Sequence, residues 1–181
     1  MIETKRLVLR PVQEEDESDI FEYSRNKNVG PNAGWKPHES VEETRAVMKE
    51  IFLGKRDVFG MILRENDRLI GTIGLVEDDK RQYDGVKMLG YALAEPYWGR
   101  GLMTEAARAV AEYGLSRYCA ISAYCYTQNR RSQRVLEKCG LNTGLEIPFL
   151  EFERLVSEKI LLAGKGREIC GDCQWAYICH K

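Results

Sequence analysis

Residues 96–106 read Pro-Tyr-Trp-Gly-Arg-Gly-Leu-Met-Thr-Glu-Ala, and this stretch determines how the rest of the chain is interpreted. Residues 89–93, before it, are an apolar run suited to a buried strand, and residues 102–118 carry apolar side chains at helical spacing. Gly99 and Gly101 allow backbone conformations in which successive N–H groups converge at the start of that helix. Because these amides and the positive end of a helix dipole favour phosphate oxygens, the stretch predicts an anion-binding site.

Two common nucleotide-binding motifs do not fit this loop. A P-loop requires Lys followed by Ser or Thr after its second glycine, and a dinucleotide-binding fingerprint requires a third glycine. A simpler alternative is that Gly99 and Gly101 only permit a tight turn between a strand and a helix. The loop by itself therefore leaves a phosphate site and a structural turn both open.

The composition indicates one globular domain without a general affinity for polyanions. The chain has 181 residues, of which 44% are hydrophobic and 30% are charged, and its net charge is −1. This balance gives no overall attraction to nucleic acid or to an anionic membrane, so a phosphate site must be local. The first residues lack the apolar core of a signal peptide and no run reaches membrane-spanning length, so we expect a cytoplasmic protein whose six cysteines are mostly free thiols.

Apolar periodicity and turn-forming residues predict the remaining elements. Ser40 and Glu43 form a capping box that starts a helix ending at Gly54. A strand is expected at residues 6–12, a helix at 16–25, a loop at 29–38, strands at 58–63, 69–76, 87–93 and 120–126, and a helix ending at Gly140. The strand at 120–126 is expected to be buried. Residues 145–152 and 156–163 could pair as strands, although a helix is equally compatible with the second segment.

Two motifs together resemble one enzyme superfamily. Residues 97–106 closely resemble the acetyl-CoA pyrophosphate loop of the GCN5-related N-acetyltransferase (GNAT) superfamily, in the form typical of its ribosomal-protein-alanine-acetyltransferase-like branch. Residues 129–141 are similar to the Asn-x-x-Ser helix of that branch, which ends in a Glu-Lys-x-Gly turn. Residues 4–10 and 70–75 resemble its first strand and central hairpin, so the resemblance extends over about residues 2–162.

The resemblance implies an α/β (α+β) fold. Its sheet is mixed and mostly antiparallel, with about six or seven strands, a splayed central parallel pair and about four flanking helices. Residues 1–163 would form the acetyltransferase domain, and residues 164–181 would be a Cys-rich tail. Binding of acetyl-CoA and of an amine acceptor follows from the same resemblance, in a monomer or a homodimer.

The resemblance also implies which residues bind acetyl-CoA. Loop amides would hold the pyrophosphate, the strand before the loop would pair with the pantetheine arm, Asn129 would hydrogen-bond that arm, and Ser132 would donate a proton to the leaving thiolate. Both Asn129 and Ser132 could instead be helix caps. Trp98 replaces the usual Gln or Arg, and the side chain of Met103 must point away from the phosphates. The implied set is Leu93, Trp98, Gly99, Arg100, Gly101, Leu102, Met103, Thr104, Asn129 and Ser132.

Direct transfer to an amine needs a neutral nucleophile but neither a metal nor a covalent intermediate. An α-amino group with a pKa of about 8 is partly neutral already, whereas a lysine at about 10.4 needs a base. Glu77 and Glu95 are candidate bases, and the catalytic set is Ser132 with Glu95, although either carboxylate could be a solvated surface charge. Trp35 and His38 lie where the family places an acceptor-lining loop, and plain packing is the alternative for both.

Other functions remain open at this stage. The acceptor could be a protein N-terminus or a small-molecule amine, and a non-catalytic acyl-CoA-binding sensor would use the same donor site. A Cys-x-x-Cys pair in the tail could contribute to a zinc-dependent interaction module, while free thiols or an adventitious disulfide are the alternatives. The tail residues concerned are Cys170, Cys173, Cys179 and His180.

Overall fold

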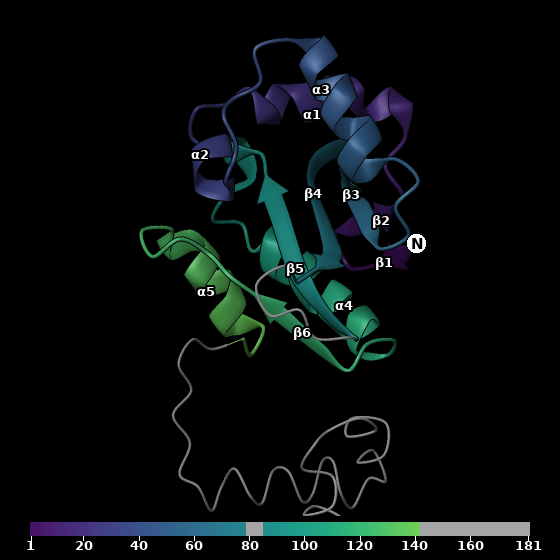
Figure 1. Cartoon of the computed structure of the whole chain (residues 1–181), viewed down its shortest axis with the longest axis vertical. Helices are drawn as coiled ribbons and strands as arrows, with labels where there is room; N and C mark the ends of the chain where they lie inside the picture. The colour runs from purple at the N-terminus through teal and green to yellow at the C-terminus, as the bar shows by residue number, and fades with distance from the viewer. Residues whose placement is uncertain (79–84, 142–181) are drawn as a thin grey trace, which may run out of the picture. The chain divides into compact units, whose positions relative to one another are not determined.

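A six-stranded sheet runs in the order β1-β2-β3-β4-β5-β6 through the computed structural model, which describes residues 1–78 and 85–141 (Figure 1). Neighbouring strands are antiparallel except β5 and β6, which are parallel. The predicted mixed sheet with one parallel pair is therefore confirmed, while the possible strands at 145–163 and the domain boundary at 163 lie outside the described residues. The strands are Ile2–Glu3 (β1), Leu7–Arg10 (β2), Val58–Leu63 (β3), Arg68–Glu77 (β4), Val86–Leu93 (β5) and Ala120–Ala123 (β6).

Five α-helices accompany the described part of the sheet. They are Glu17–Ser24 (α1), Gly30–Ala33 (α2), Val41–Val47 (α3), Leu102–Leu115 (α4) and Arg130–Lys138 (α5). The helix α2 is a single turn inside the segment that the sequence predicted as a loop, and Pro31 fits its first turn because a first-turn residue needs no N–H partner. A π-turn at Met48–Phe52 extends α3, and 3₁₀ turns occupy Glu14–Asp16 and Glu95–Tyr97.

The predicted cap of α3 forms, with one difference in its second hydrogen bond. The Ser40 hydroxyl accepts the N–H of Glu43 at 3.1 Å, as a capping box requires. The Glu43 carboxylate accepts the N–H of Glu39 at 2.7 Å, so it satisfies the residue before the N-cap. The helix begins where the sequence predicts.

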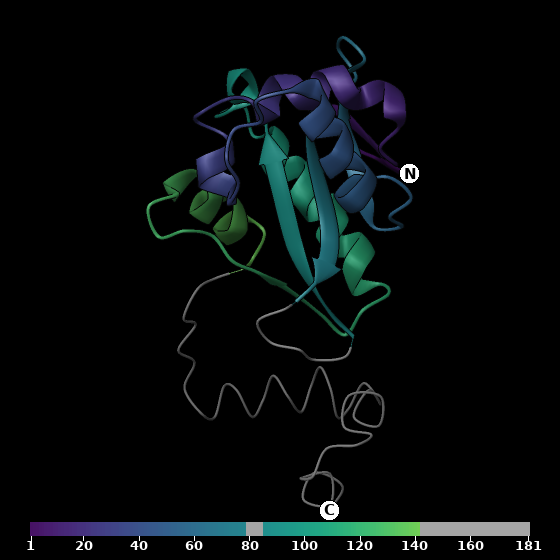
Figure 2. The ribbon, with the colours of Figure 1, turned by 45° about the horizontal axis from the view of Figure 1, so that its top comes forward.

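Two apolar clusters lie on the two faces of the sheet. Side chains of β3 alternate between them, because Met61 and Leu63 belong to the cluster that includes α4, whereas Ile62 belongs to the cluster that includes Ile20 of α1. Figure 2 shows α4 behind β4 and β5, with α1 and α3 on the other side. The described sheet is therefore covered on both faces.

The strand β6 is shorter and more exposed than predicted. It ends at Ala123 rather than at residue 126, and it pairs with β5 at only four positions. Ala120 is exposed and the other three residues of β6 are half-buried, so the expectation of a buried strand is wrong. The reason is that β6 is the last strand of the described sheet and separates from β5 after Leu89. Within residues 1–78 and 85–141, no helix has the length and apolar content needed to cross a membrane.

Candidate functional site

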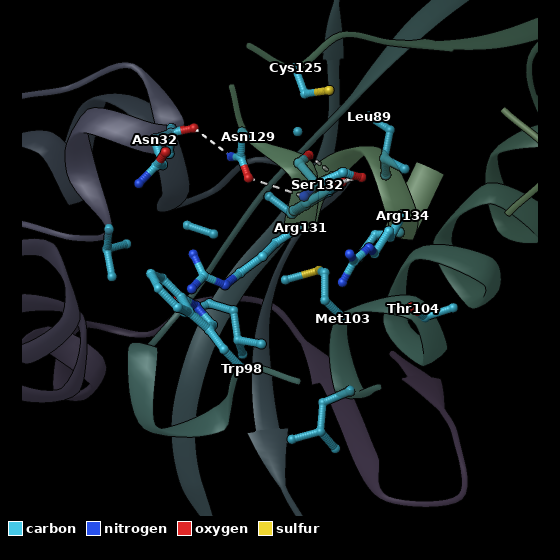
Figure 3. Close-up of a pocket in the computed structure, with 18 of the residues that line it drawn as sticks. Asn32, Leu89, Trp98, Met103, Thr104, Cys125, Asn129, Arg131, Ser132 and Arg134 are labelled. Carbon is cyan, nitrogen blue, oxygen red and sulfur yellow. Dashed lines mark hydrogen bonds between the residues drawn. The ribbon is translucent and has the colours of Figure 1, made fainter. Parts of the chain in front are cut away.

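A cavity of about 440 Å³ lies where β5 and β6 separate (Figure 3). The two strands pair from Val86 with Ala120 as far as Leu89 with Ala123, and β5 then continues to Leu93 without β6 beside it. Residues 88–93 of β5 line the cavity, together with residues 124–126 that follow β6. The splay predicted for the parallel pair is present, and it creates the cavity.

The glycine loop lines the cavity just beyond the end of β5. Gly99 and Gly101 both have φ of +75°, a left-handed backbone that favours glycine. A Cβ on Gly99 would meet no atom within 4 Å, so backbone conformation rather than crowding requires glycine there. Gly101 is the N-cap of α4 and has no side chain to accept hydrogen bonds from the first turn. The amides of that turn therefore depend on an external acceptor, as they do in anion sites at helix N-termini.

Every charged side chain among the described residues that line the cavity is a cation. These side chains are Arg131, Arg134 and Lys138, which stand three and four positions apart and so share one face of α5. The Arg131 guanidinium lies over the Trp98 ring, 4.6 Å from its centroid (Figure 3). Together with the N-terminus of α4, these cations make the cavity suitable for an anionic ligand even though the net charge of the chain is −1.

Glu105 in the first turn of α4 connects the glycine loop to the N-terminal strands. Its carboxylate accepts hydrogen bonds from the Thr4 hydroxyl at 2.7 Å, the Arg6 N–H at 2.8 Å and the Arg6 guanidinium at 2.7 Å. The same guanidinium donates to the carbonyl of Arg100 at 2.9 Å. Burial raises the pKa of Glu105, but the hydrogen bonds from Thr4 and Arg6 outweigh burial and hold it below its ordinary value. Arg6 thus balances a negative charge close to the cavity and holds the loop in shape.

Comparison with known protein families shows which family this chain belongs to. The family model described as an acetyltransferase (GNAT) domain matches residues 6–142, well over half of the chain. The chain belongs to the GNAT acetyltransferase family. The resemblance inferred from the two motifs is therefore confirmed for the family, while its ribosomal-protein-alanine-acetyltransferase-like branch stays a prediction.

Individual relatives agree with this assignment. The acetyltransferase is 30% identical to YoaA, an uncharacterised N-acetyltransferase of Bacillus subtilis, over 149 residues that make up 77% of this chain and 81% of the relative. A crystal structure of a GNAT-family acetyltransferase from Bacillus anthracis matches with a TM-score of 0.67 and 26% identity over 77% of this chain and 81% of that one. A spermidine N-acetyltransferase from Vibrio cholerae, solved with CoA and spermine, matches with a TM-score of 0.61 and 18% identity over 76% and 81% of the two chains.

Asn129 and Ser132 of the acetyltransferase both line the cavity, but they make different contacts. The Asn129 side chain caps α5 by accepting the Ser132 N–H at 3.1 Å, and its amide donates to the carbonyl of Asn32 at 3.0 Å. Ser132 is not a cap, because its hydroxyl lies 2.7 Å from the hydroxyl of Tyr91 on β5. Of the two residues, Asn129 is therefore the helix cap and Ser132 is not.

Most of the loop residues predicted to bind the cofactor line the cavity, and Arg100 does not. The cavity lining includes Leu93, Trp98, Gly99, Gly101, Leu102, Met103 and Thr104. Met103 is only 5% exposed and belongs to the core cluster that includes other residues of α4. The Arg100 guanidinium instead lies 3.4 Å from the Glu65 carboxylate and over the ring of Tyr97.

The two predicted acceptor residues, Trp35 and His38, are not among the residues that line the described cavity. Trp35 packs against the core cluster on the α1 side of the sheet. His38 is 8% exposed, and its Nδ1 lies 2.8 Å from the Thr44 hydroxyl of α3. The segment around α2 reaches the cavity through other side chains, namely Val29, Asn32 and Ala33.

The two candidate bases also lie away from the cavity lining. Glu95 accepts hydrogen bonds from the side-chain amides of Asn28 and Asn26, each at 2.9 Å. These bonds lower the pKa of Glu95, and the bond from Asn28 has the larger effect. Glu77 is exposed and forms an ion pair with Lys87. A carboxylate with a lowered pKa is a weak base, so the geometry favours an anchoring role for Glu95.

Sequence reasoning missed Tyr91 and the three cations of the cavity, Arg131, Arg134 and Lys138. The spacing of the basic residues in 131–138 was visible in the sequence and could have indicated a cationic helix face. Tyr91 gave no such signal, because its contact with α5 depends on the splay of the strands. The zinc alternative falls on residues 170–180, outside the described residues, and residues 1–78 and 85–141 contain no cluster of three potential metal ligands.

Proposed function

We propose that this N-acetyltransferase moves an acetyl group from acetyl-CoA to a primary α-amino group by direct attack in a ternary complex. The observation that carries the proposal is the cavity at the splayed strands, which joins a glycine loop, a helix N-terminus and a cationic face of α5. These three features suit a long ligand that is anionic at one end and amide-rich at the other.

The residues of the cavity fit acetyl-CoA, which supplies the acyl group as a reactive thioester. The first-turn amides of α4 suit the pyrophosphate, and Arg131, Arg134 and Lys138 suit the negative charges of the nucleotide end. Beyond Leu89, one edge of β5 has no strand partner among the described residues, so its backbone groups are available to the pantetheine amides. Asn129 borders the same edge and can offer its amide by releasing the carbonyl of Asn32.

The charge of the cavity favours a particular class of acceptor. No carboxylate belongs to the described lining, so this part of the cavity offers neither a carboxylate base nor an anionic partner for a polycation. An α-amino group is partly neutral near pH 8, whereas a lysine side chain or a polyamine remains almost fully protonated. The terminus of a peptide or an amino acid therefore suits this cavity better than spermine, the ligand in the Vibrio cholerae structure.

A panel of amines tests the proposal. The protein is incubated with acetyl-CoA and a peptide with a free N-terminus, the same peptide with a blocked N-terminus and one lysine, or spermine, while thiol release and product mass are followed. We expect turnover with the free N-terminus, and at least about tenfold lower kcat/KM for the lysine peptide and for spermine at pH 7.5.

Two results would contradict parts of this proposal. Turnover of spermine or of the lysine peptide in preference to the free N-terminus would overturn the acceptor class and leave the transfer reaction intact. Binding of CoA in calorimetry, with thiol release at the blank rate for every amine, would instead indicate a sensor that binds acyl-CoA without catalysis.

A further inference from the structure

A short hydrogen bond connects the splayed strand to the helix that carries Ser132. The Tyr91 hydroxyl lies 2.7 Å from the Ser132 hydroxyl and 3.3 Å from its backbone carbonyl. Tyr91 stands two residues beyond Leu89, where β5 and β6 part, and both Tyr91 and Ser132 line the cavity. The bond therefore joins the two sides of the site next to the edge of β5 proposed for the pantetheine arm.

Either hydroxyl can donate at this distance, and the chemistry of the two groups favours Tyr91 as the donor. A phenol is a stronger donor than an aliphatic alcohol, and a serine hydroxyl has two acceptor lone pairs besides its one proton. Burial raises the pKa of Tyr91 to about 12, more than the hydrogen bond to Ser132 lowers it, so the phenol keeps its proton. When Tyr91 donates to Ser132, the serine retains its own proton for a third group.

We propose that Tyr91 is a positioning residue that, by donating to Ser132, directs the serine hydroxyl toward the sulfur of the thioester. The inference rests on the proposed acetyl transfer. In that reaction the amine nitrogen bonds to the acyl carbon, the C–S bond breaks with its electron pair going to sulfur, and the proton lost by the amine goes to water. Ser132 donates a hydrogen bond to the sulfur as its negative charge develops, and Tyr91 stays protonated throughout.

The test is a double-mutant cycle on kcat with the best amine. Tyr91→Phe keeps the ring and removes the hydroxyl, and we expect kcat to fall roughly 3- to 10-fold, the value of one hydrogen bond, with the KM for acetyl-CoA unchanged. Ser132→Ala should lower kcat at least as much, and the double variant should match Ser132→Ala alone, because Tyr91 acts only through Ser132. Ser132→Thr, which keeps a hydroxyl, should retain more kcat when Tyr91 is present than in the Tyr91→Phe background.

A matched control separates positioning from stability. The hydroxyl of Tyr118 donates to Asp57 at 2.6 Å, outside the described cavity lining, so Tyr118→Phe also removes one short tyrosine hydrogen bond. It should lower the melting temperature without lowering kcat, and melting temperature and CoA affinity are measured for every variant. Wild-type kcat in Tyr91→Phe or in Ser132→Ala, or effects of the two that multiply, would overturn the inference while the proposed function stands. A wild-type protein that acetylates no amine would overturn both.

Discussion

The Arg131 guanidinium lies 4.6 Å from the centroid of the Trp98 ring, so an aromatic side chain from the glycine loop orients a cation from α5 (Figure 3). The indole N–H of Trp98 donates to the carbonyl of Leu93 at 2.7 Å, which fixes the ring against the end of β5. Trp98 occupies the loop position where the superfamily usually has Gln or Arg. Arg131, from another element, therefore brings a guanidinium to this position of the loop.

Replacing Arg131 tests this relationship. Arg131→Gln should raise the Kd for CoA roughly 3- to 10-fold, because it removes one charge-assisted contact, and the dependence of the Kd on salt should weaken. Arg131→Lys keeps the charge but loses the planar stacking on the indole, so its Kd should lie between the two. Calorimetry at two salt concentrations measures both effects. Arg130→Gln is the control, because Arg130 is exposed and bonds Gln133 instead; an equal effect there would argue against a specific role for Arg131.

A left-handed glycine can avoid backbone strain and can also let backbone amides reach a ligand. Comparing Gly101 with Gly54 separates these two effects. Both have positive φ, +75° and +70°, and a Cβ would meet only Arg6, at 3.6 Å, at Gly101 and nothing within 4 Å at Gly54. Alanine at either position should therefore cost about 1–2 kcal/mol of unfolding free energy through backbone strain. Only Gly101→Ala should weaken CoA binding, since Gly54 lies outside the described cavity lining. Urea unfolding and CoA titration of both variants test this, and unchanged CoA affinity in Gly101→Ala would refute the amide cradle.

The carboxylate of Glu105 predicts how stability changes with pH. Its pKa is lower in the folded protein than the ordinary 4.5, so the unfolded chain binds more protons in acid. The stabilisation is therefore fully present above about pH 4.5 and is lost as the pH falls through the lowered value. Glu105→Gln should cost about 1–3 kcal/mol at pH 7, and its difference from the wild type should shrink in acid, as urea unfolding at several pH values would record.

An exposed ion pair provides the control for Glu105. Glu65 lies 3.4 Å from Arg100 and is 73% exposed, so Glu65→Gln should change the unfolding free energy by less than about 0.5 kcal/mol at any pH. A Glu105→Gln deficit that stayed constant from pH 7 to pH 3.5 would show that the carboxylate acts through shape and not through its charge.

The parts of this molecule that could be predicted from the sequence are those set by local chemistry. A pair of glycines just before a helix, here Gly99 and Gly101, indicates a loop with left-handed backbone conformations. The apolar periodicity of α4 indicates which of its faces is buried. Ser40 marks the start of α3 for the same reason, since a cap contacts amides only three residues away.

The parts that could not be predicted depend on how distant elements pack. The bond between Tyr91 and Ser132 joins residues 41 positions apart. It forms because β5 continues past Leu89, where its pairing with β6 ends. The early end of β6 at Ala123 has the same origin, since its sequence remains compatible with a strand beyond that point. His38 was proposed as an acceptor residue from its loop position, but its side chain is buried and its Nδ1 lies 2.8 Å from the Thr44 hydroxyl.

Glu95 provides the last prediction, because the sequence suggested it as a general base. A base should have a pKa near the working pH, whereas the amides of Asn28 and Asn26 lower that of Glu95. Glu95→Gln keeps an acceptor oxygen for one amide, so kcat/KM for the best amine should stay within about twofold of wild type between pH 6 and pH 9. The melting temperature should fall slightly as the turn around Asn28 loosens. A loss of about 100-fold in kcat/KM, or disappearance of an ionisation from the pH–rate profile, would restore Glu95 as the base and would require its carboxylate to leave both amides.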